Sequence, residues 1–139
     1  MNKGATAKAV VVHDLDQAMA ALAVAAELQR PVAIWSARRA ALDLGIGWFA
    51  AVARLARAAE PRAEAIFILD CGSRADLVQE AFREGLGEAC FTGRAAVAER
   101  LADIARKSRA RLHMKRPRAL DLARKVDIQS ALRTYLGGN

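Results

Sequence analysis

The segment IFILDCGSRADL (66–77) places an acid, a thiol and a hydroxyl directly after an apolar run. Cys71 lies at the predicted start of a helix and beside Arg74, a setting that lowers the pKa of a thiol and favours a nucleophile. Such a nucleophile needs a base, and His13 is the candidate. Asp70 could act as a metal ligand, a ribose acceptor or a phosphoryl acceptor, or could equally anchor backbone N–H groups of its own loop. Asp70, Cys71 and His13 are therefore the candidate catalytic residues, and the alternative is that Cys71 is a buried structural residue.

Helix capping explains several neighbouring polar residues without any ligand. The segments DLDQ (14–17) and SRAD (73–76) each begin with a capping residue and carry an amide or acid three positions later. Thr92 could cap a following helix in the same way. We therefore expect Asp14, Ser73 and Thr92 to be N-caps, which leaves Asp70 and Cys71 without a capping explanation.

Short apolar runs alternate with helical periods along the chain. The runs predict buried strands at 9–13, 32–35, 65–69, 88–92 and, more weakly, 111–114. Apolar residues at spacings of three and four predict helices between these strands, near 15–26, 48–59, 77–82 and 97–104. A C-terminal segment of about 119–136 is also expected to be helical, with Asp127 capping its second part.

This alternation predicts an α/β fold formed as a single domain over residues 1–139. We expect a doubly wound domain with about five mostly parallel strands and helices on both faces. The strand order should be flavodoxin-like (2-1-3-4-5) or Rossmann-like (3-2-1-4-5), and the sequence does not separate the two.

Ligands of open parallel sheets bind beyond the carboxyl ends of the strands. The residues that follow the predicted strands are rich in arginine, glycine and hydroxyl side chains, which suit a phosphate or a carboxylate. The candidate anion-binding residues are Arg38, Arg39, Asp70, Ser73, Arg74, Thr92 and Arg94.

Four of the strand-end residues resemble those of the receiver domains of two-component signalling. They are Asp14 after the first strand, Asp70 after the third, Thr92 after the fourth and Lys115 in the segment MKRP after the fifth. The resemblance implies that Asp70 accepts phosphate, Asp14 helps to hold magnesium, Thr92 switches and Lys115 pairs with the phosphate. A histidine replaces the family's first acid, an arginine interrupts its Lys-Pro pair, and the link between the second and third strands is longer. We treat the resemblance as one of fold type.

The segment LDLGIGWF (42–49) places two glycines before a helix that starts with Trp48 and Phe49. It lacks the third glycine of a dinucleotide fingerprint and follows the second strand, so it does not predict a dinucleotide site. Two interpretations remain open. Trp48 could insert into the core, or Trp48 and Phe49 could form an exposed apolar anchor for a partner chain, including a second copy in a homodimer.

The net charge of +7 is concentrated in the basic segment 105–125, which holds nine Lys or Arg residues and a single acid. Such a run is commonly a solvated face, but it also attracts nucleic acid, anionic lipid or anionic metabolites. The segment contains no aromatic residue on which a base could stack. Nucleic-acid binding would therefore rest on phosphate contacts and would depend strongly on salt.

The two cysteines show no metal-ligand spacing, so the sequence predicts neither a metal site nor a disulfide framework. No apolar run approaches the ~18 residues of a transmembrane helix, and we expect a cytoplasmic protein. The function predicted is a non-enzymatic module that binds an anionic or phosphorylated small molecule, or a protein partner, at the carboxyl edge of the sheet. The alternatives are an enzyme using Asp70 or Cys71 with His13, and a nucleic-acid binder acting through 105–125. No cofactor is assigned.

Overall fold

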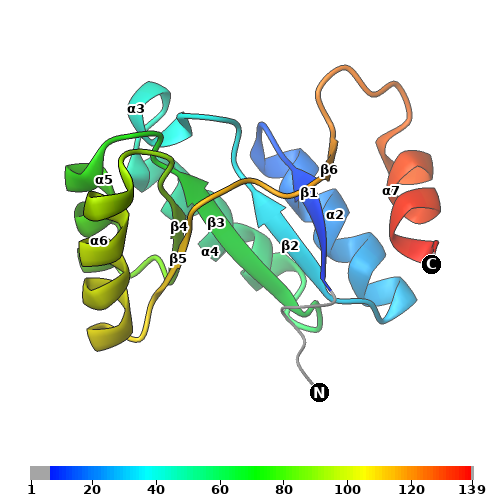
Figure 1. Cartoon of the computed structure of the whole chain (residues 1–139). Helices are drawn as coiled ribbons and strands as arrows, with labels where there is room; N and C mark the ends of the chain where they lie inside the picture. Colours follow the sequence, from blue (N-terminus) through cyan, green and yellow to red (C-terminus); the bar gives the residue numbers. More distant parts are fainter. Residues whose placement is uncertain (1–6, 139) are drawn as a thin grey trace. The chain divides into compact units, whose positions relative to one another are not determined.

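The structure is a computed structural model that describes residues 7–138, and it contains a sheet of six parallel strands flanked by helices (Figure 1). The strands are β1 (Lys8–Val11), β2 (Val32–Trp35), β3 (Ala65–Asp70), β4 (Glu88–Cys90), β5 (Arg111–His113) and β6 (Ala119–Asp121). The helices are α2 (Leu15–Leu28), α3 (Ala40–Asp43), α4 (Ile46–Ala59), α5 (Ala75–Arg83), α6 (Ala95–Lys107) and α7 (Ile128–Gly137). The predicted doubly wound α/β class is confirmed.

The strand order is β5-β4-β3-β2-β1-β6, which matches neither of the two predicted orders. The sixth strand is a second difference, because residues 119–121 were predicted to begin a C-terminal helix. They pair instead with the open edge of β1, in the register Ala9↔Ala119 to Val11↔Asp121. The sequence ALD is locally compatible with a helix, and only the distant β1 edge selects the strand. The helix α7 starts at Ile128, where Asp127 caps it as predicted by accepting from the N–H of Ser130 (3.0 Å).

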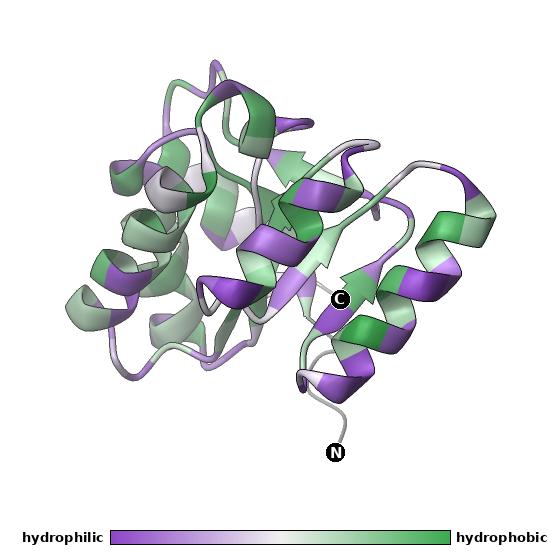
Figure 2. Ribbon diagram, turned by 90° about the vertical axis from the view of Figure 1, so that its left-hand side faces the viewer, coloured by the Kyte–Doolittle hydropathy of each residue, from purple (hydrophilic) through white to green (hydrophobic). Residues whose placement is uncertain are grey.

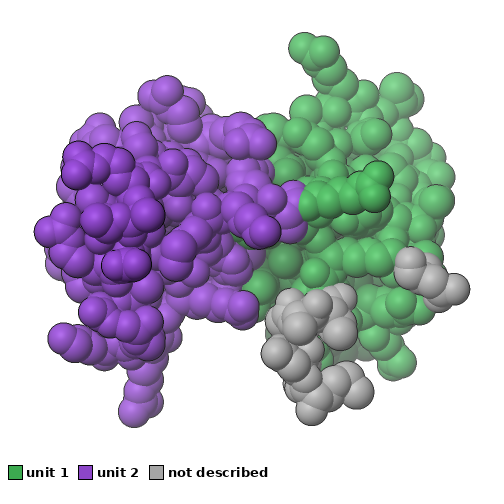
Figure 3. Space-filling model, in the orientation of Figure 1, with its two compact units in different colours: residues 1–35, 52–66, 118–139 green, residues 36–51, 67–117 purple. Residues whose placement is uncertain are grey.

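The chain forms two compact units (Figure 3). Unit 1 comprises residues 1–35, 52–66 and 118–139, and unit 2 comprises residues 36–51 and 67–117. The strand β3 and the helix α4 each contribute residues to both units.

Unit 1 is built on β1, which pairs in parallel with β2 on one side and β6 on the other. Helix α2 packs against α7 and buries a face that includes Ala18 and Leu22. Asp14 is the N-cap of α2 as predicted, since its carboxylate accepts from the N–H of Gln17 (2.8 Å). In unit 1 the capping residue of α2 is therefore the one that the local sequence pattern predicts.

Unit 2 contains the carboxyl-terminal part of β3, which pairs in parallel with β4, and β4 pairs in parallel with β5. The helices α5 and α6 pack against each other and each bury one face, such as Val78 and Ala81 of α5. Hydrophilic and hydrophobic residues alternate along the helices in Figure 2, as expected for helices with one buried face. Among residues 7–138, no helix has the length and apolar character that crossing a bilayer requires.

The aromatic pair at the start of α4 belongs to the core of unit 2. Phe49 is 0% exposed, and its ring meets Phe67 edge-on with 5.9 Å between centroids. Trp48 is half-buried, with its ring centroid 5.9 Å from that of Phe49. The hypothesis that both rings form an exposed anchor is therefore wrong for Phe49, because helical spacing turns this residue toward the strands.

Candidate functional site

Asp70, at the end of β3, is the centre of a buried polar network in unit 2. Its side chain is 4% exposed. Its Oδ1 accepts from the backbone N–H of Arg39 (3.0 Å) and of Gly72 (2.9 Å). Its Oδ2 accepts from Nη1 of Arg116 (2.8 Å). Both carboxylate oxygens are therefore engaged within the unit.

Ser36 connects the same network to the loop after β2. It is 0% exposed, and its Oγ accepts from the N–H of Asp70 (2.9 Å) and donates to the carbonyl of Ala37 (3.0 Å). Nη2 of Arg116 donates to the carbonyl of Ser36 (2.9 Å). Among the described residues, no buried side-chain nitrogen or oxygen lacks a hydrogen-bond partner. We call Ser36, Asp70 and Arg116 the Asp70 network.

The loop backbones fit this network closely. Gly72 has a φ of +59°, and a Cβ at this position would lie 3.3 Å from Cγ of Arg39. The carbonyl of Gly72 accepts from the N–H of Thr92 (2.9 Å), so the network extends to the loop before α6. At Gly93 a Cβ would lie 2.4 Å from Cζ of the buried Phe91 ring, so this loop passes over the ring only with glycine there. Hydrogen bonds thus join the loops that follow β2, β3, β4 and β5.

Cys71 is fully buried, and its N–H donates to the carbonyl of Cys90 (2.9 Å). Burial, followed by the negative charge of Asp70, raises the pKa of Cys71 to about 12. Burial also raises the pKa of Cys90 to about 11. The expectation that Arg74 and a helix N-terminus lower the pKa of Cys71 is wrong, because Arg74 is exposed and pairs with Asp76 (2.7 Å).

His13 belongs to unit 1, whereas Asp70 and Cys71 belong to unit 2. Within unit 1, Nε2 of His13 lies 2.6 Å from Oδ1 of Asp121, and the same oxygen accepts from the N–H of Ala123 (2.9 Å). The partner that the structure gives His13 is therefore a carboxylate of its own unit.

Two of the predicted caps are wrong. The N-cap of α5 is Arg74 and not Ser73, and the N-cap of α6 is Arg94 and not Thr92, and neither arginine side chain makes a capping bond. Ser73 and Thr92 are both exposed. At α5 the cap function passes to Asp76, whose pKa is lowered mainly by Arg74 and also by the N–H groups of the first turn. The amino end of α6 has neither a side-chain cap nor an acid in its first turn.

Five exposed cations lie in these loops of unit 2: Arg38, Arg39, Arg74, Arg94 and Lys115. The charges of Arg116 and Arg38 both act to lower the pKa of Cys90, which locates Arg38 near the end of β4. The structure therefore brings together Arg38, Arg39, Asp70, Ser73, Arg74, Thr92 and Arg94 in the loops at one edge of unit 2. No group of three or more His, Cys, Asp or Glu side chains in residues 7–138 could hold a metal ion.

Ser36 and Arg116 are the network residues that were not among the predicted site residues. Ser36 directly follows β2, and Arg116 follows β5 by three positions, so the strand-end rule that selected the others applies to both. Both residues follow predicted strands, but neither was selected as a site residue. Within the basic segment, Arg116 is mostly buried against Asp70, Arg106 pairs with Asp103, and residues 118–125 belong to unit 1.

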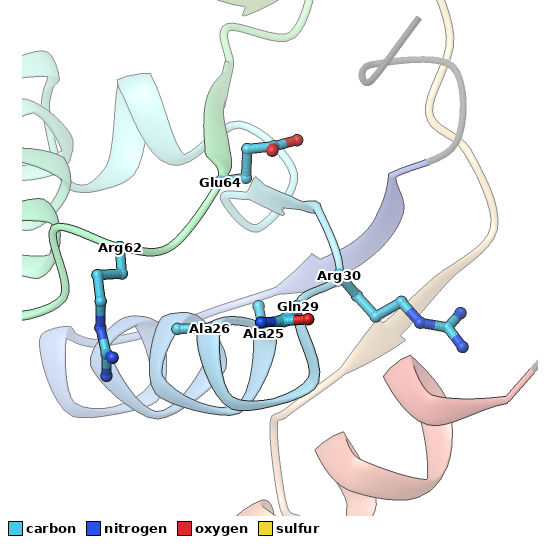
Figure 4. Close-up of a pocket in the computed structure, with 6 residues that line it drawn as sticks. All are labelled: Ala25, Ala26, Gln29, Arg30, Arg62 and Glu64. Atoms are coloured by element: carbon cyan, nitrogen blue, oxygen red, sulfur yellow. The ribbon is translucent and has the colours of Figure 1, made fainter. Parts of the chain in front are cut away.

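Unit 1 contains a separate hollow of about 220 Å³ beside the end of α2. Its walls are Ala25, Ala26, Gln29, Arg30, Arg62 and Glu64. Figure 4 shows the charged ends of Arg30, Arg62 and Glu64 extending in three different directions. The hollow therefore lacks the convergent polar groups of a ligand site.

No protein-family model matches the chain, and a search of the curated proteins found no relative. The receiver-domain resemblance does not extend to the structure, because receiver domains have the order 2-1-3-4-5, which differs from the order found here. The implied phosphoacceptor Asp70 also has both oxygens engaged.

We expect both cysteines to react slowly and at similar rates with an alkylating probe in the folded protein. Both thiols are fully buried, and their raised pKa values keep the reactive thiolate scarce near neutral pH. Mass spectrometry of timed iodoacetamide reactions measures the two rates, and the protein in urea supplies the rate of an open thiol. Fast labelling of Cys71 alone would contradict a buried, protonated Cys71 thiol and would favour an enzyme.

Proposed function

We propose that unit 2 is a non-enzymatic module that binds an anionic, phosphate-bearing small molecule at the carboxyl ends of its strands. One observation carries the proposal. The loops after four strands are joined through the buried Asp70–Arg116 pair, while Arg38, Arg94 and Lys115 stay exposed on those same loops.

The amino end of α6 is the part of this edge best suited to a phosphate. The first N–H groups of a helix have no intrahelical partner, and the helix dipole makes this end positive. At α6 no side chain caps these groups, and Ala95 and Ala96 are exposed. The hydroxyl of Thr92 and the guanidinium of Arg94 belong to the same short segment, and both are groups that bind phosphate oxygens.

The other three long helices that have an N-cap assigned already hold a carboxylate at this end. Asp14 caps α2 and Asp127 caps α7, while Asp76 lies in the first turn of α5. An external anion would therefore compete with a fixed carboxylate at those helices but not at α6. We therefore place the proposed phosphate contacts in the loop between β4 and α6.

The chemistry of the two candidate nucleophiles supports binding over catalysis. Asp70 uses both oxygens in hydrogen bonds, and the Cys71 thiol stays protonated at neutral pH because its pKa is raised to about 12. The nucleic-acid alternative is less favoured, because the basic segment holds no Phe, Trp or Tyr for base stacking and Arg116 is neutralised by Asp70.

Thermal denaturation tests the proposal with inorganic phosphate, glucose 6-phosphate and citrate, and with sodium chloride as the ionic-strength control. A ligand at 100 times its Kd adds about 2.7 kcal/mol to the free energy of unfolding, which raises the Tm by several degrees. The variant Arg38→Gln/Arg94→Gln should lose this shift. Arg74 is left unchanged in this variant, since its guanidinium is paired with Asp76.

The matched control is Arg83→Gln/Arg100→Gln. It removes the same charge from exposed positions of α5 and α6 in the same unit. The control should keep the full shift. An equal loss of the shift in both double variants would show only a general effect of charge, and the absence of any shift in the wild type would favour a protein partner instead.

A further inference from the structure

We propose that Arg116 is a positioning residue of this anion site, which sets the geometry of the binding loops through Asp70 and Ser36 and does not contact the ligand. The inference rests on the proposed function. Arg116 would thus have a different role from the exposed arginines at the same edge, which contact the ligand, although all of them carry the same charge.

The contacts of Arg116 are directed inward. Its side chain is 11% exposed, against 4% for Asp70. Nη1 donates to Oδ2 of Asp70 (2.8 Å) and Nη2 donates to the carbonyl of Ser36 (2.9 Å), so both terminal nitrogens bind the network. The planar guanidinium presents its donors in a fixed fork that can hold two acceptors at once. The negative charge of Asp70 therefore offsets the positive charge of Arg116 and weakens the attraction of Arg116 for an external anion.

Asp70, which Arg116 binds, makes hydrogen bonds toward both sides of the proposed site. On one side, Asp70 fixes the N–H of Arg39, next to Arg38 in the loop after β2. On the other side, Asp70 fixes the N–H of Gly72, whose carbonyl accepts from the N–H of Thr92 just before α6. Arg116 thus connects the two loops that carry the proposed ligand contacts.

A buried ion pair is a weak source of stability, because desolvation of both charges offsets most of their attraction. The presence of the Asp70–Arg116 pair therefore fits a role in fixing one arrangement of the loops. A positioning role makes a prediction that a contact role does not: the affinity should depend on the shape of the side chain at 116 even when its charge is kept.

The test uses the full chain and inorganic phosphate as the probe, with affinity measured by calorimetry. The variant Arg116→Lys keeps the charge, but a single ammonium on a flexible stem cannot hold both acceptors in the same geometry. We expect its affinity for phosphate to fall by about tenfold, in line with the loss of a charged hydrogen bond. The control Arg111→Lys makes the same exchange at an exposed position of β5 and should bind as the wild type does.

Two readouts separate positioning from contact and from a purely structural role. The double variant Asp70→Asn/Arg116→Gln should also bind weakly, but its affinity should depend on ionic strength as steeply as that of the wild type, because it removes two opposite charges together and no ligand-contacting charge is lost. Amide hydrogen exchange without phosphate should speed up at Arg39 and Gly72 in Arg116→Lys, while the helical amides of α6 keep their protection. If Arg116→Lys does not fold, Ser36→Ala perturbs the same network without changing any charge and takes its place.

The outcomes are distinct. Equal phosphate affinity for Arg116→Lys and the wild type would overturn the positioning role and leave the proposed function intact. A shallower dependence on ionic strength in Asp70→Asn/Arg116→Gln would make Arg116 a direct contact and would also overturn it. A wild-type protein that binds no phosphate would overturn the proposed function itself.

Discussion

Replacing Asp70 by Asn is expected to lower the free energy of unfolding by about 3–5 kcal/mol, because it leaves the buried charge of Arg116 without its counter-charge. The Asp70 side chain is 4% exposed and the Arg116 side chain 11%, so water cannot take over the lost interaction. An asparagine also presents at most one acceptor oxygen, while the carboxylate serves the N–H groups of Arg39 and Gly72 in addition to Arg116.

Urea denaturation followed by circular dichroism measures this loss. The control is Asp76→Asn, which breaks the exposed pair with Arg74 at the amino end of α5 and should lower the stability far less than Asp70→Asn does. A double variant, Asp70→Leu/Arg116→Met, should recover only part of the stability, since it removes both charges together but leaves the N–H groups of Arg39 and Gly72 without their acceptor. If Asp70→Asn were as stable as the wild type, the buried ion pair described here would be incorrect.

Replacing Phe49 by Ala is expected to destabilise the protein by about 3–5 kcal/mol, the usual range for deleting a buried ring. Phe49 is 0% exposed and packs edge-on against Phe67, so its removal leaves a cavity between α4 and β3 within unit 2. This prediction also decides between the two interpretations of the aromatic pair.

The matched control is Leu44→Ala, five residues earlier in the chain and 53% exposed, which should change the stability little. Sedimentation at several protein concentrations should give the same mass for Phe49→Ala and the wild type. A change of oligomeric state in Phe49→Ala with unchanged stability would instead place this ring in an interface between chains.

The sequence predicts the class of the fold well because the class depends on local patterns. Continuous apolar runs mark β1 and β3, and residues at spacings of three and four mark the helices that follow. The caps Asp14 and Asp127 were predicted for the same reason, since a cap is read from four adjacent residues. Ser73 and Thr92 were wrong as caps because the helices begin one or two residues later than the pattern suggested.

The strand order could not be predicted, because parallel neighbours are chosen by contacts between residues far apart in the chain. β6 shows this most clearly. Its three residues contain no β-branched or aromatic side chain, and its pairing with β1 joins positions 110 residues apart, as in Ala9↔Ala119. Local propensity therefore favoured a helix where the free edge of β1 imposed a strand.

The candidate site was predicted as an edge of the sheet but not as a network. The strand-end rule selected Asp70, Arg38 and Arg94, which lie in unit 2 at or shortly after the ends of β3, β2 and β4. It could not show that Asp70 is neutralised by Arg116, 46 positions later, because that pairing depends on β5 lying next to β4. The burial of Cys71 was one of two alternatives that the sequence left open, since a thiol after a strand can lie on either side of a loop.

The most direct test of the anion site is an NMR titration of the amide resonances with inorganic phosphate. We predict that the shifts concentrate at Thr92 and the first turn of α6, with smaller shifts at 37–39, and that Arg38→Gln/Arg94→Gln abolishes them. Shifts that concentrate instead at 107–111, or that persist in this double variant, would contradict a phosphate site at the carboxyl edge of unit 2.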